Sequence, residues 1–297
     1  MKVTIIGSNG FLAKSIASYS NRNNFDLVIV GKSKPIAYDY RNFYKIDLLT
    51  GDVPYNKILK SDIIIYAAGA GIQSNLKENF SSIYELNVLI PIKICKNLSL
   101  LKFKGSFVSF GSYFEIGPNK LNIKYDELKL IQSDNITSSD YCISKRMITR
   151  FMSSSNFCFR AWHFILPTIY GEKESNHRLI PYVIKSIKNK TKLKLTSGTQ
   201  VRQYIYVDEI PKIIFKALNK KIISGIYNIE GTETLSVKDL VSNLHKLFNE
   251  KLDTKIFGKV SRSDSNMEIL KLSGEKLING INFKPSIKIS DVYEKYK

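Results

Sequence analysis

Three side chains near the middle of the chain have the types and spacing needed for proton transfer. Lys145 follows Tyr141 by one helical turn, and Ser112 lies about thirty residues earlier, just after the strand-like run 107–110. A phenol can exchange a proton with a reacting oxygen, an ammonium favours the ionised phenol, and a hydroxyl can hold the same oxygen. This combination is typical of hydride transfer with a nicotinamide as the carrier, so we predict an oxidoreductase.

The Tyr-x-x-x-Lys spacing alone is not specific, because it also occurs at Tyr125 and Tyr293. Tyr125 lies in a polar stretch before a helix start, and Tyr293 lies in the terminal residues, where chains tend to fray. Of the three tyrosines, only Tyr141 lies in a predicted helix that follows the predicted strand 107–110 and the serine after it, Ser112. The sequence context therefore favours Tyr141 as the reactive residue.

The segment GSNGFLA follows a short apolar run at 3–6 and precedes a helical pattern. Gly7 permits a tight turn, Gly10 lets the backbone approach a pyrophosphate, and Ala13 keeps the helix close to the sheet. The phosphates would bind at the helix N-terminus. We therefore interpret the segment as a dinucleotide site rather than a plain strand-to-helix turn, with contacts from Gly7, Asn9, Gly10, Phe11 and Leu12.

The residues after the second apolar run, 27–30, indicate which dinucleotide is used. An acid there would accept a ribose hydroxyl, but the chain offers Lys32, Ser33 and Lys34, which suit a 2′-phosphate. NADP(H) is therefore favoured over NAD(H), although both lysines could be solvated loop charges. Asp47 and Leu48, which follow the next short run, are predicted to border the adenine.

Short apolar runs alternate with helical patterns along the first half of the chain. The runs 3–6, 27–30, 63–66 and 107–110 predict buried strands, with helices over 81–98 and 139–152. This pattern indicates an α/β fold, a Rossmann doubly wound parallel sheet with a smaller interleaved C-terminal substrate lobe. We expect residues 1–166 to form the NAD(P)-binding domain, with 203–230 returning to it, and 167–297 to form mainly the substrate lobe.

The second half of the chain is less regular, and its predicted elements are shorter. We expect strands over 157–162, 193–195, 204–207 and 226–229 and helices over 179–187 and 208–218. Ser236 has the position of an N-terminal cap for a further helix.

Lys and Arg number 45 against 26 Asp and Glu, which gives a net charge of +19. The basic residues are scattered, so we expect no nucleic-acid partner. Three cysteines without a C-x-x-C pair, and three histidines without ligand spacing, predict no metal site and a cytoplasmic protein. Because the run 3–6 already reads as a buried strand, we expect no leader, and because no apolar run is long enough to span a bilayer, we expect no membrane insertion.

Together these motifs resemble the extended short-chain dehydrogenase/reductase family, and within it the nucleotide-sugar epimerases, dehydratases and 4-keto-reductases. The resemblance covers nearly the whole chain. It rests on GSNGFLA, the Ala67-Ala68-Gly69 run, Asn87, FGSYFEIG around Ser112, YCISK from Tyr141, Tyr170-Gly171, LIPYV from Leu179, VRQYIYVDE around Arg202 and a late Arg262-Ser263-Asp264.

The resemblance implies a role for each matching residue. Tyr141 would be the general acid/base, Lys145 would bind the nicotinamide ribose, and Ser112 would hold the reacting oxygen. An ammonium roughly 4 Å from the phenol would lower the pKa of Tyr141 by about 3 units. The remaining implied contacts are Ala67, Ala68, Gly69 and Asn87 for the cofactor and Tyr113, Leu179, Arg202 and Arg262 for the nucleotide-sugar substrate.

The resemblance also narrows the reaction. The dehydratases carry an acid pair after the active-site hydroxyl residue, where this chain has Tyr113 and Phe114, so dehydration is disfavoured although Glu115 follows. The chain looks most like 4-keto-reductases of the CDP-abequose synthase type. This resemblance implies NADPH-dependent reduction of the 4-keto group of a nucleotide-activated deoxyhexose, in the synthesis of a bacterial surface polysaccharide. It also implies a homodimer that pairs through helices 87–98 and 141–152. A 4-epimerase with bound NAD and a non-catalytic NAD(P) sensor are the alternatives.

Overall fold

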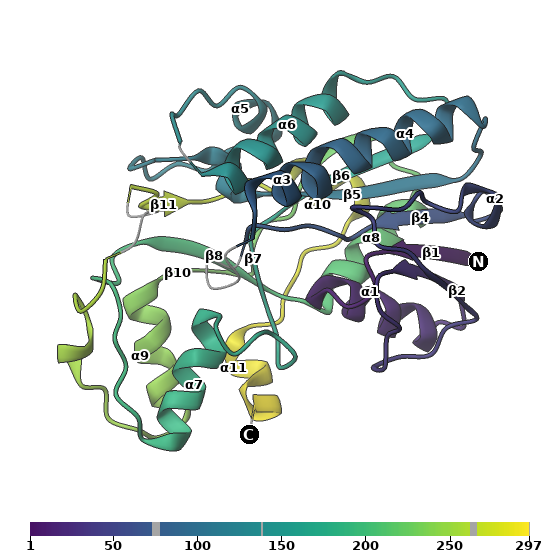
Figure 1. Cartoon of the computed structure of the whole chain (residues 1–297). Coiled ribbons are helices and arrows are strands. Elements are labelled where there is room, and N and C mark those ends of the chain that lie inside the picture. The colour runs from purple at the N-terminus through teal and green to yellow at the C-terminus, as the bar shows by residue number, and fades with distance from the viewer. Residues whose placement is uncertain (73–77, 138, 262–265, 297) are drawn as a thin grey trace.

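The computed structural model describes residues 1–72, 78–137, 139–261 and 266–296, and two sheets organise them (Figure 1). The large sheet has seven strands, all parallel, in the order β3-β2-β1-β4-β5-β6-β9. Its strands are β1 (Lys2–Ile6), β2 (Asp26–Gly31), β3 (Asn42–Lys45), β4 (Ile63–Tyr66), β5 (Ser106–Ser112), β6 (Arg160–Leu166) and β9 (Gly225–Asn228).

Helices cover both faces of the large sheet, which confirms the predicted doubly wound α/β fold (Figure 1). One face carries α3 (Phe80–Tyr84), the π-helical turn η2 (Glu85–Leu89), α4 (Ile90–Leu100) and α6 (Asp140–Ser154). The other face carries α1 (Phe11–Arg22), α8 (Glu209–Asn219) and α10 (Glu275–Ile281). Shorter helical segments around this sheet are α2 (Tyr55–Ile58), η3 (Tyr113–Ile116) and α5 (Glu127–Ile131).

The smaller sheet belongs to a second lobe. Its strands are β7 (Thr168–Tyr170), β8 (Val201–Tyr206), β10 (Glu233–Ser236) and β11 (Ile269–Leu270), with β8 paired to all three others. The lobe also holds α7 (Leu179–Asn189), α9 (Val237–Leu247), η4 (Thr254–Ile256), α11 (Ile289–Val292) and η5 (Tyr293–Tyr296). Ser236 caps α9 as predicted, since its hydroxyl accepts the Asp239 N–H at 3.0 Å.

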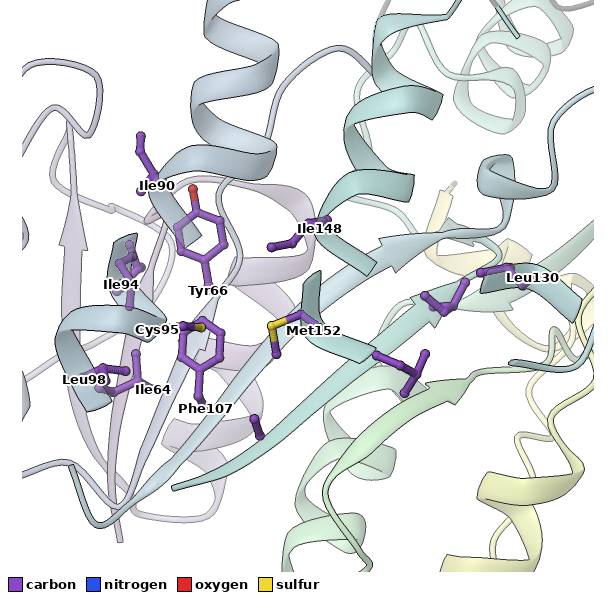
Figure 2. Close-up of a cluster of buried hydrophobic side chains, with 14 of the residues drawn as sticks. Ile64, Tyr66, Ile90, Ile94, Cys95, Leu98, Phe107, Leu130, Ile148 and Met152 are labelled. Atoms are coloured by element: carbon purple, nitrogen blue, oxygen red, sulfur yellow. The ribbon is translucent and has the colours of Figure 1, made fainter. Parts of the chain in front are cut away.

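The buried strands form because their side chains are apolar on both faces, as a sheet covered on both sides requires. Figure 2 shows the core on the α4 and α6 side, where Ile64, Tyr66 and Phe107 from the strands meet Ile94 and Met152 from the helices. The opposite face is filled by a second cluster from β1, α1 and α8. These two cores hold the strand ends that carry the predicted site residues.

The chain changes direction across the sheet between β1 and β4. From β1 it proceeds outward through β2 and β3, and it then returns to place β4, β5 and β6 on the other side. In open parallel sheets, ligands bind outside the carboxyl ends of the strands at such a reversal. The ends of β1, β4 and β5 are therefore the place to look for a site.

Three predictions about the second half need correction. Residues 193–195 form no strand, although Leu193 and Leu195 are buried in the core of the small lobe. The strand predicted over 157–162 is β6, displaced toward Leu166 to pair along β5. Strand β8 pairs in the smaller sheet, so the return to the large sheet within 203–230 consists of α8 and β9. We keep the two-domain division as a proposal.

Within the described ranges, no helix combines the length and the apolar character that crossing a membrane requires.

Candidate active site

A pocket of about 290 Å³ lies at the carboxyl ends of β4 and β5 and at the start of α1. It is lined by residues from the N-terminal loop, from both strand ends, from α6 and from the segment after β6. We call it the central cleft. The predicted site residues that line it are Gly10, Phe11, Leu12, Ala67, Ala68, Gly69, Asn87, Ser112, Tyr113, Tyr141 and Lys145.

Tyr141 and Lys145 are placed by the first turns of α6. Ser139 caps the helix, since its hydroxyl accepts the Cys142 N–H at 3.4 Å. The Lys145 ammonium lies 5.9 Å from the centre of the Tyr141 ring and donates to the Phe110 carbonyl at 3.0 Å. Burial lowers the pKa of Lys145 to about 8, so this ammonium loses its proton at moderately alkaline pH.

The Tyr141 phenol differs from the expectation. Burial raises the pKa of Tyr141 to about 12, against the opposing effects of a hydrogen bond with the Ser112 side chain and of the Arg178 charge. The expected acidification by Lys145 is not found in this structure, because the ammonium is directed to a backbone carbonyl of β5. At neutral pH the phenol therefore keeps its proton.

Ser112 ends β5 and begins the short helix η3. Its hydroxyl accepts the Phe114 N–H at 3.3 Å, and its own N–H donates to Glu115 Oε1 at 2.7 Å. The next residue, Tyr113, is buried, and its hydroxyl lies 2.6 Å from that of Thr168 at the start of β7. These contacts fix the turn that presents the serine to the cleft.

The N-terminal loop fits a dinucleotide pyrophosphate. Gly7 has φ +106°, and a β-carbon there would lie 2.6 Å from the Ala68 nitrogen, so only glycine allows this turn. Gly10 is the N-cap of α1, which has no side-chain cap and no acid in its first turn. The first N–H groups of α1 thus offer an anion site beside the cleft.

The residues predicted at the adenosine end lie after β2 and β3, outside the lining of the central cleft. The Asn9 amide donates to Ser33 Oγ at 2.8 Å, which ties the N-terminal loop to the end of β2. Lys32 forms an ion pair of 2.9 Å with Asp47, and a hydrogen bond from Lys32 lowers the pKa of Asp47. Leu48 packs against the core below.

Asn87 lies in the π-helical turn η2, a distortion that is frequent at functional sites. Its side-chain oxygen accepts the Ala70 N–H at 3.0 Å, and its amide donates to the Ala70 carbonyl at 2.9 Å and to Ser144 Oγ at 3.0 Å. Asn87 therefore holds the loop after β4 against α6.

Two predicted substrate residues, Leu179 and Arg202, are not among those that line the central cleft. Arg202 is buried in β8, where one guanidinium nitrogen donates to the carbonyls of Val201 and Glu268. Leu179 begins α7 and packs on the core of the small lobe. Arg262 lies outside the described residues. Their predicted contacts with substrate stay predictions.

Sequence reasoning missed an ion pair in the wall of the cleft. Arg178 Nε donates to Glu174 Oε1 at 2.8 Å, and both residues line the cleft together with Ser175. Burial raises the pKa of Glu174 to about 7. The available signal was the pair of opposite charges four residues apart, shortly after Tyr170.

A sequence model described as the NAD dependent epimerase/dehydratase family matches residues 3–229. The chain belongs to this family. The match confirms the resemblance to the extended short-chain dehydrogenase/reductase family that the sequence motifs indicated.

The relatives of this chain that are named CDP-abequose synthase include two from Salmonella. The protein from Salmonella muenchen is 27% identical over 192 residues, which are 62% of this chain and 60% of the relative. The protein from Salmonella typhimurium is 21% identical over 300 residues, which are 96% of this chain and 93% of the relative. The first of these matches spans only about three fifths of the relative's length.

Solved structures of family members share the fold. The UDP-glucuronic acid 4-epimerase from Bacillus cereus, in complex with UDP-glucuronic acid and NAD, gives a TM-score of 0.81 at 17% identity and covers 100% of this chain and 98% of its own. A double mutant of the dTDP-glucose 4,6-dehydratase DesIV from Streptomyces venezuelae, with NAD bound, gives 0.85 at 17% identity, covering 100% and 95%. At such identities the likeness establishes the architecture.

Proposed function

We propose that this enzyme uses NADPH to reduce the 4-keto group of a nucleotide-activated deoxyhexose, in the synthesis of a bacterial surface polysaccharide. The observation that carries the proposal is the convergence of Ser112, Tyr141 and Lys145 in one cleft beside the uncapped N-terminus of α1. The likeness to proteins named CDP-abequose synthase supports this class of substrate.

The site residues have complementary tasks in this reaction. The bound dinucleotide supplies the hydride. Tyr141 donates its phenolic proton to the oxygen on C4, and Ser112 holds that oxygen. Lys145 holds the ribose hydroxyls and so orients the nicotinamide toward C4 of the sugar. A phenol whose pKa is about 12 is protonated at neutral pH, which is the form that a reductase needs at the start of its reaction.

The same geometry argues against dehydration. In the dehydratases that the chain resembles, an acid pair directly after the active-site hydroxyl residue removes a proton beside the transient ketone. Tyr113 and Phe114 follow the serine and line the cleft, whereas the Glu115 carboxyl points to the Ser112 N–H. The buried carboxyl is therefore not directed at a substrate.

A 4-epimerase with retained NAD is the second candidate. The ion pair between Lys32 and Asp47 favours it, because a lysine that is already paired with a carboxylate is less available to a 2′-phosphate. A protein that only senses NAD(P) would have no use for the three catalytic side chains, and we rank it last.

Absorbance at the reduced-nicotinamide band, recorded with a panel of 4-keto-6-deoxy sugar nucleotides, tests the proposal. Steady consumption of NADPH with one of them is the expected result. A second panel contains the corresponding 4-hydroxy sugar nucleotides: their interconversion at C4 without net cofactor consumption would instead identify an epimerase, and cofactor binding without either reaction would favour the sensor.

Replacement of the lysines after β2 tests the cofactor preference. In the Lys32→Ala, Lys34→Ala double variant we expect the KM for NADPH to rise about 10- to 100-fold, the value of one or two charged hydrogen bonds, with the KM for NADH unchanged. The measurement is initial rate against each cofactor, with the exposed Lys57→Ala as the control. An equal change for both cofactors would contradict a 2′-phosphate contact.

The oligomeric state can be tested on the outer faces of the helices packed on β4 and β5. Leu89, Leu100 and Met147 are exposed there, on η2, α4 and α6. We expect a homodimer in which these helices pair, with a mass by light scattering twice the chain mass of 33.9 kDa. Met147→Glu should dissociate it, whereas Ile223→Glu, on an exposed residue outside these helices, should not. A wild-type monomer would refute the pairing.

A further inference from the structure

Glu115 is a carboxyl buried inside the catalytic turn, and the reaction described above gives it no task. It is fully inaccessible and is the third residue of η3. Its Oε1 accepts the Ser112 N–H at 2.7 Å, while the Ser112 hydroxyl caps the same turn. A side chain at this position therefore determines how the end of β5 presents its serine.

The space for this carboxyl is provided by a glycine. A β-carbon at Gly111 would lie 2.5 Å from Glu115 Oε1 and 2.8 Å from His163 Nε2. Both polar groups thus occupy the volume above Gly111, on the side of β5 that faces β6 and α6. The pair of Gly111 and Glu115 forms one structural unit beneath the cleft.

The titratable groups that face Glu115 come from two elements. Tyr141, Cys142, Lys145 and Arg146 lie on α6, and His163 lies on β6. Strand β11, which also packs on η3, consists of the apolar Ile269–Leu270. Lys145 and Arg146 are the two cations among these groups at neutral pH. His163 is not a third, because burial lowers the pKa of His163 to about 3 and keeps the imidazole neutral.

The two cations are used differently. Arg146 donates through its guanidinium to the carbonyls of Glu115, Asn135 and Ile116, so it is engaged with the backbone of the loop. Lys145 donates to the Phe110 carbonyl, and Glu115 is the group whose charge favours the protonated lysine. Among the described residues no ion pair joins Glu115 to Lys145, so the carboxylate acts on the ammonium of the catalytic lysine through its charge, at longer range than a direct contact.

The hydroxyls around His163 complete the environment of Glu115. Ser109 Oγ lies 2.7 Å from His163 Nδ1, and Thr149 Oγ1 lies 2.9 Å from His163 Nε2. If Ser109 donates to Nδ1, the Nε2–H donates to Thr149, whose own proton is then available to Glu115. This tautomer agrees with the hydrogen bond from Thr149 that lowers the pKa of Glu115.

We propose that Glu115 is a positioning residue of the active site: its carboxylate fixes the Ser112 turn and supplies the counter-charge that keeps the buried ammonium of Lys145 protonated. The inference deepens the proposed function and rests on it for the role of Lys145. It assigns a purpose to an acid that the sequence comparison with dehydratases left without one.

Burial works against both charges of the pair. It raises the pKa of Glu115 to about 7 and lowers the pKa of Lys145 to about 8, so both groups are ionised between these values. An opposite charge within a few Å shifts a pKa by about 1 to 3 units. Loss of the carboxylate charge should therefore lower the pKa of Lys145 further and remove its proton at neutral pH.

The decisive variant is Glu115→Gln, which keeps an oxygen acceptor for the Ser112 N–H and removes the charge. In the cofactor-free protein, the Nζ resonance of Lys145 is followed by NMR against pH and assigned with Lys145→Arg. We expect its midpoint to fall by about 1 to 3 units. In the reduction assay, the alkaline midpoint of the pH profile of kcat/KM should fall by the same amount as the NMR midpoint. The acidic midpoint due to Glu115 should disappear.

Glu127→Gln is the matched control, because Glu127 is also a buried glutamate that accepts a backbone N–H, that of Asn228 at 2.7 Å. It should leave the Lys145 midpoint unchanged. An unchanged midpoint in Glu115→Gln would overturn the proposal. If that variant fails to fold, the wild type still decides: the Lys145 resonance must show a second step at about pH 7 from Glu115, and its absence would be equally fatal. Since the NMR titration needs no substrate, it remains informative even if no sugar nucleotide is reduced.

Discussion

Tyr141→Phe should lower kcat about 10²- to 10⁴-fold, the usual contribution of a positioned general acid, while the Kd for the cofactor stays the same. The phenolic oxygen is the donor that the reacting oxygen needs, and phenylalanine preserves the ring. The ring contacts Phe114 edge to face, with centroids 6.2 Å apart, so the variant should fold like the wild type.

The chain contains its own control for this experiment. Tyr125 has the same spacing to a lysine, Lys129. The Tyr125 hydroxyl donates to Asn119 Oδ1 at 3.3 Å, and neither Tyr125 nor Asn119 is among the residues that line the central cleft. Tyr125→Phe should retain most of the wild-type turnover in the same assay, with cofactor binding followed by fluorescence titration. Full turnover in Tyr141→Phe would remove the phenol from the mechanism.

Lys145→Met should weaken both cofactor affinity and turnover, each by about 10- to 100-fold, because a charged hydrogen-bond donor is lost from a buried site. The loss should appear in kcat as well as in the Kd, since a nicotinamide that is held less firmly is also less well aligned for hydride transfer. Methionine has a similar length and packs well in an apolar environment, which limits the effect on folding.

Isothermal titration of the cofactor and initial rates separate these two effects. Lys129→Met serves as the comparison, because that lysine is exposed and lies 5.4 Å from the centre of the Tyr125 ring. It should change neither quantity. Normal cofactor affinity in Lys145→Met would show that this ammonium does not hold the ribose.

Much of the fold could be predicted because its signals are local. Strand β4 coincides with the run 63–66, and helices α7 and α8 match their apolar periodicity within two residues. The prediction failed where burial came from tertiary packing. Residues 193–195 look like a strand because Leu193 and Leu195 alternate with lysine, yet these side chains fill the core of the small lobe. Phe157 and Phe159 are of a residue type that is common in strands, so the approach to β6 looked like the strand itself, whereas in the structure their rings stack with centroids 5.0 Å apart.

The site was predictable to the extent that it depends on backbone periodicity. Tyr141 and Lys145 share a helix face, and Ser112 is at a strand end, so each position follows from its element. The burial of Glu115 and the pairing of Glu174 with Arg178 depend on which elements pack against them, which the sequence does not reveal. The raised pKa of Tyr141 has the same origin, because desolvation requires the assembled cleft.

Transfer of deuterium from the cofactor to the sugar distinguishes reduction at C4 from the alternative reactions. The enzyme is incubated with a 4-keto-6-deoxy sugar nucleotide and NADPH that carries deuterium at the transferred position of C4, and the product is analysed by mass spectrometry and NMR. We expect one deuterium on C4 of the sugar for each NADPH oxidised. A keto sugar nucleotide that is recovered unreduced, with no NADPH oxidation, from an enzyme that interconverts the corresponding 4-hydroxy epimers would contradict the proposed reduction.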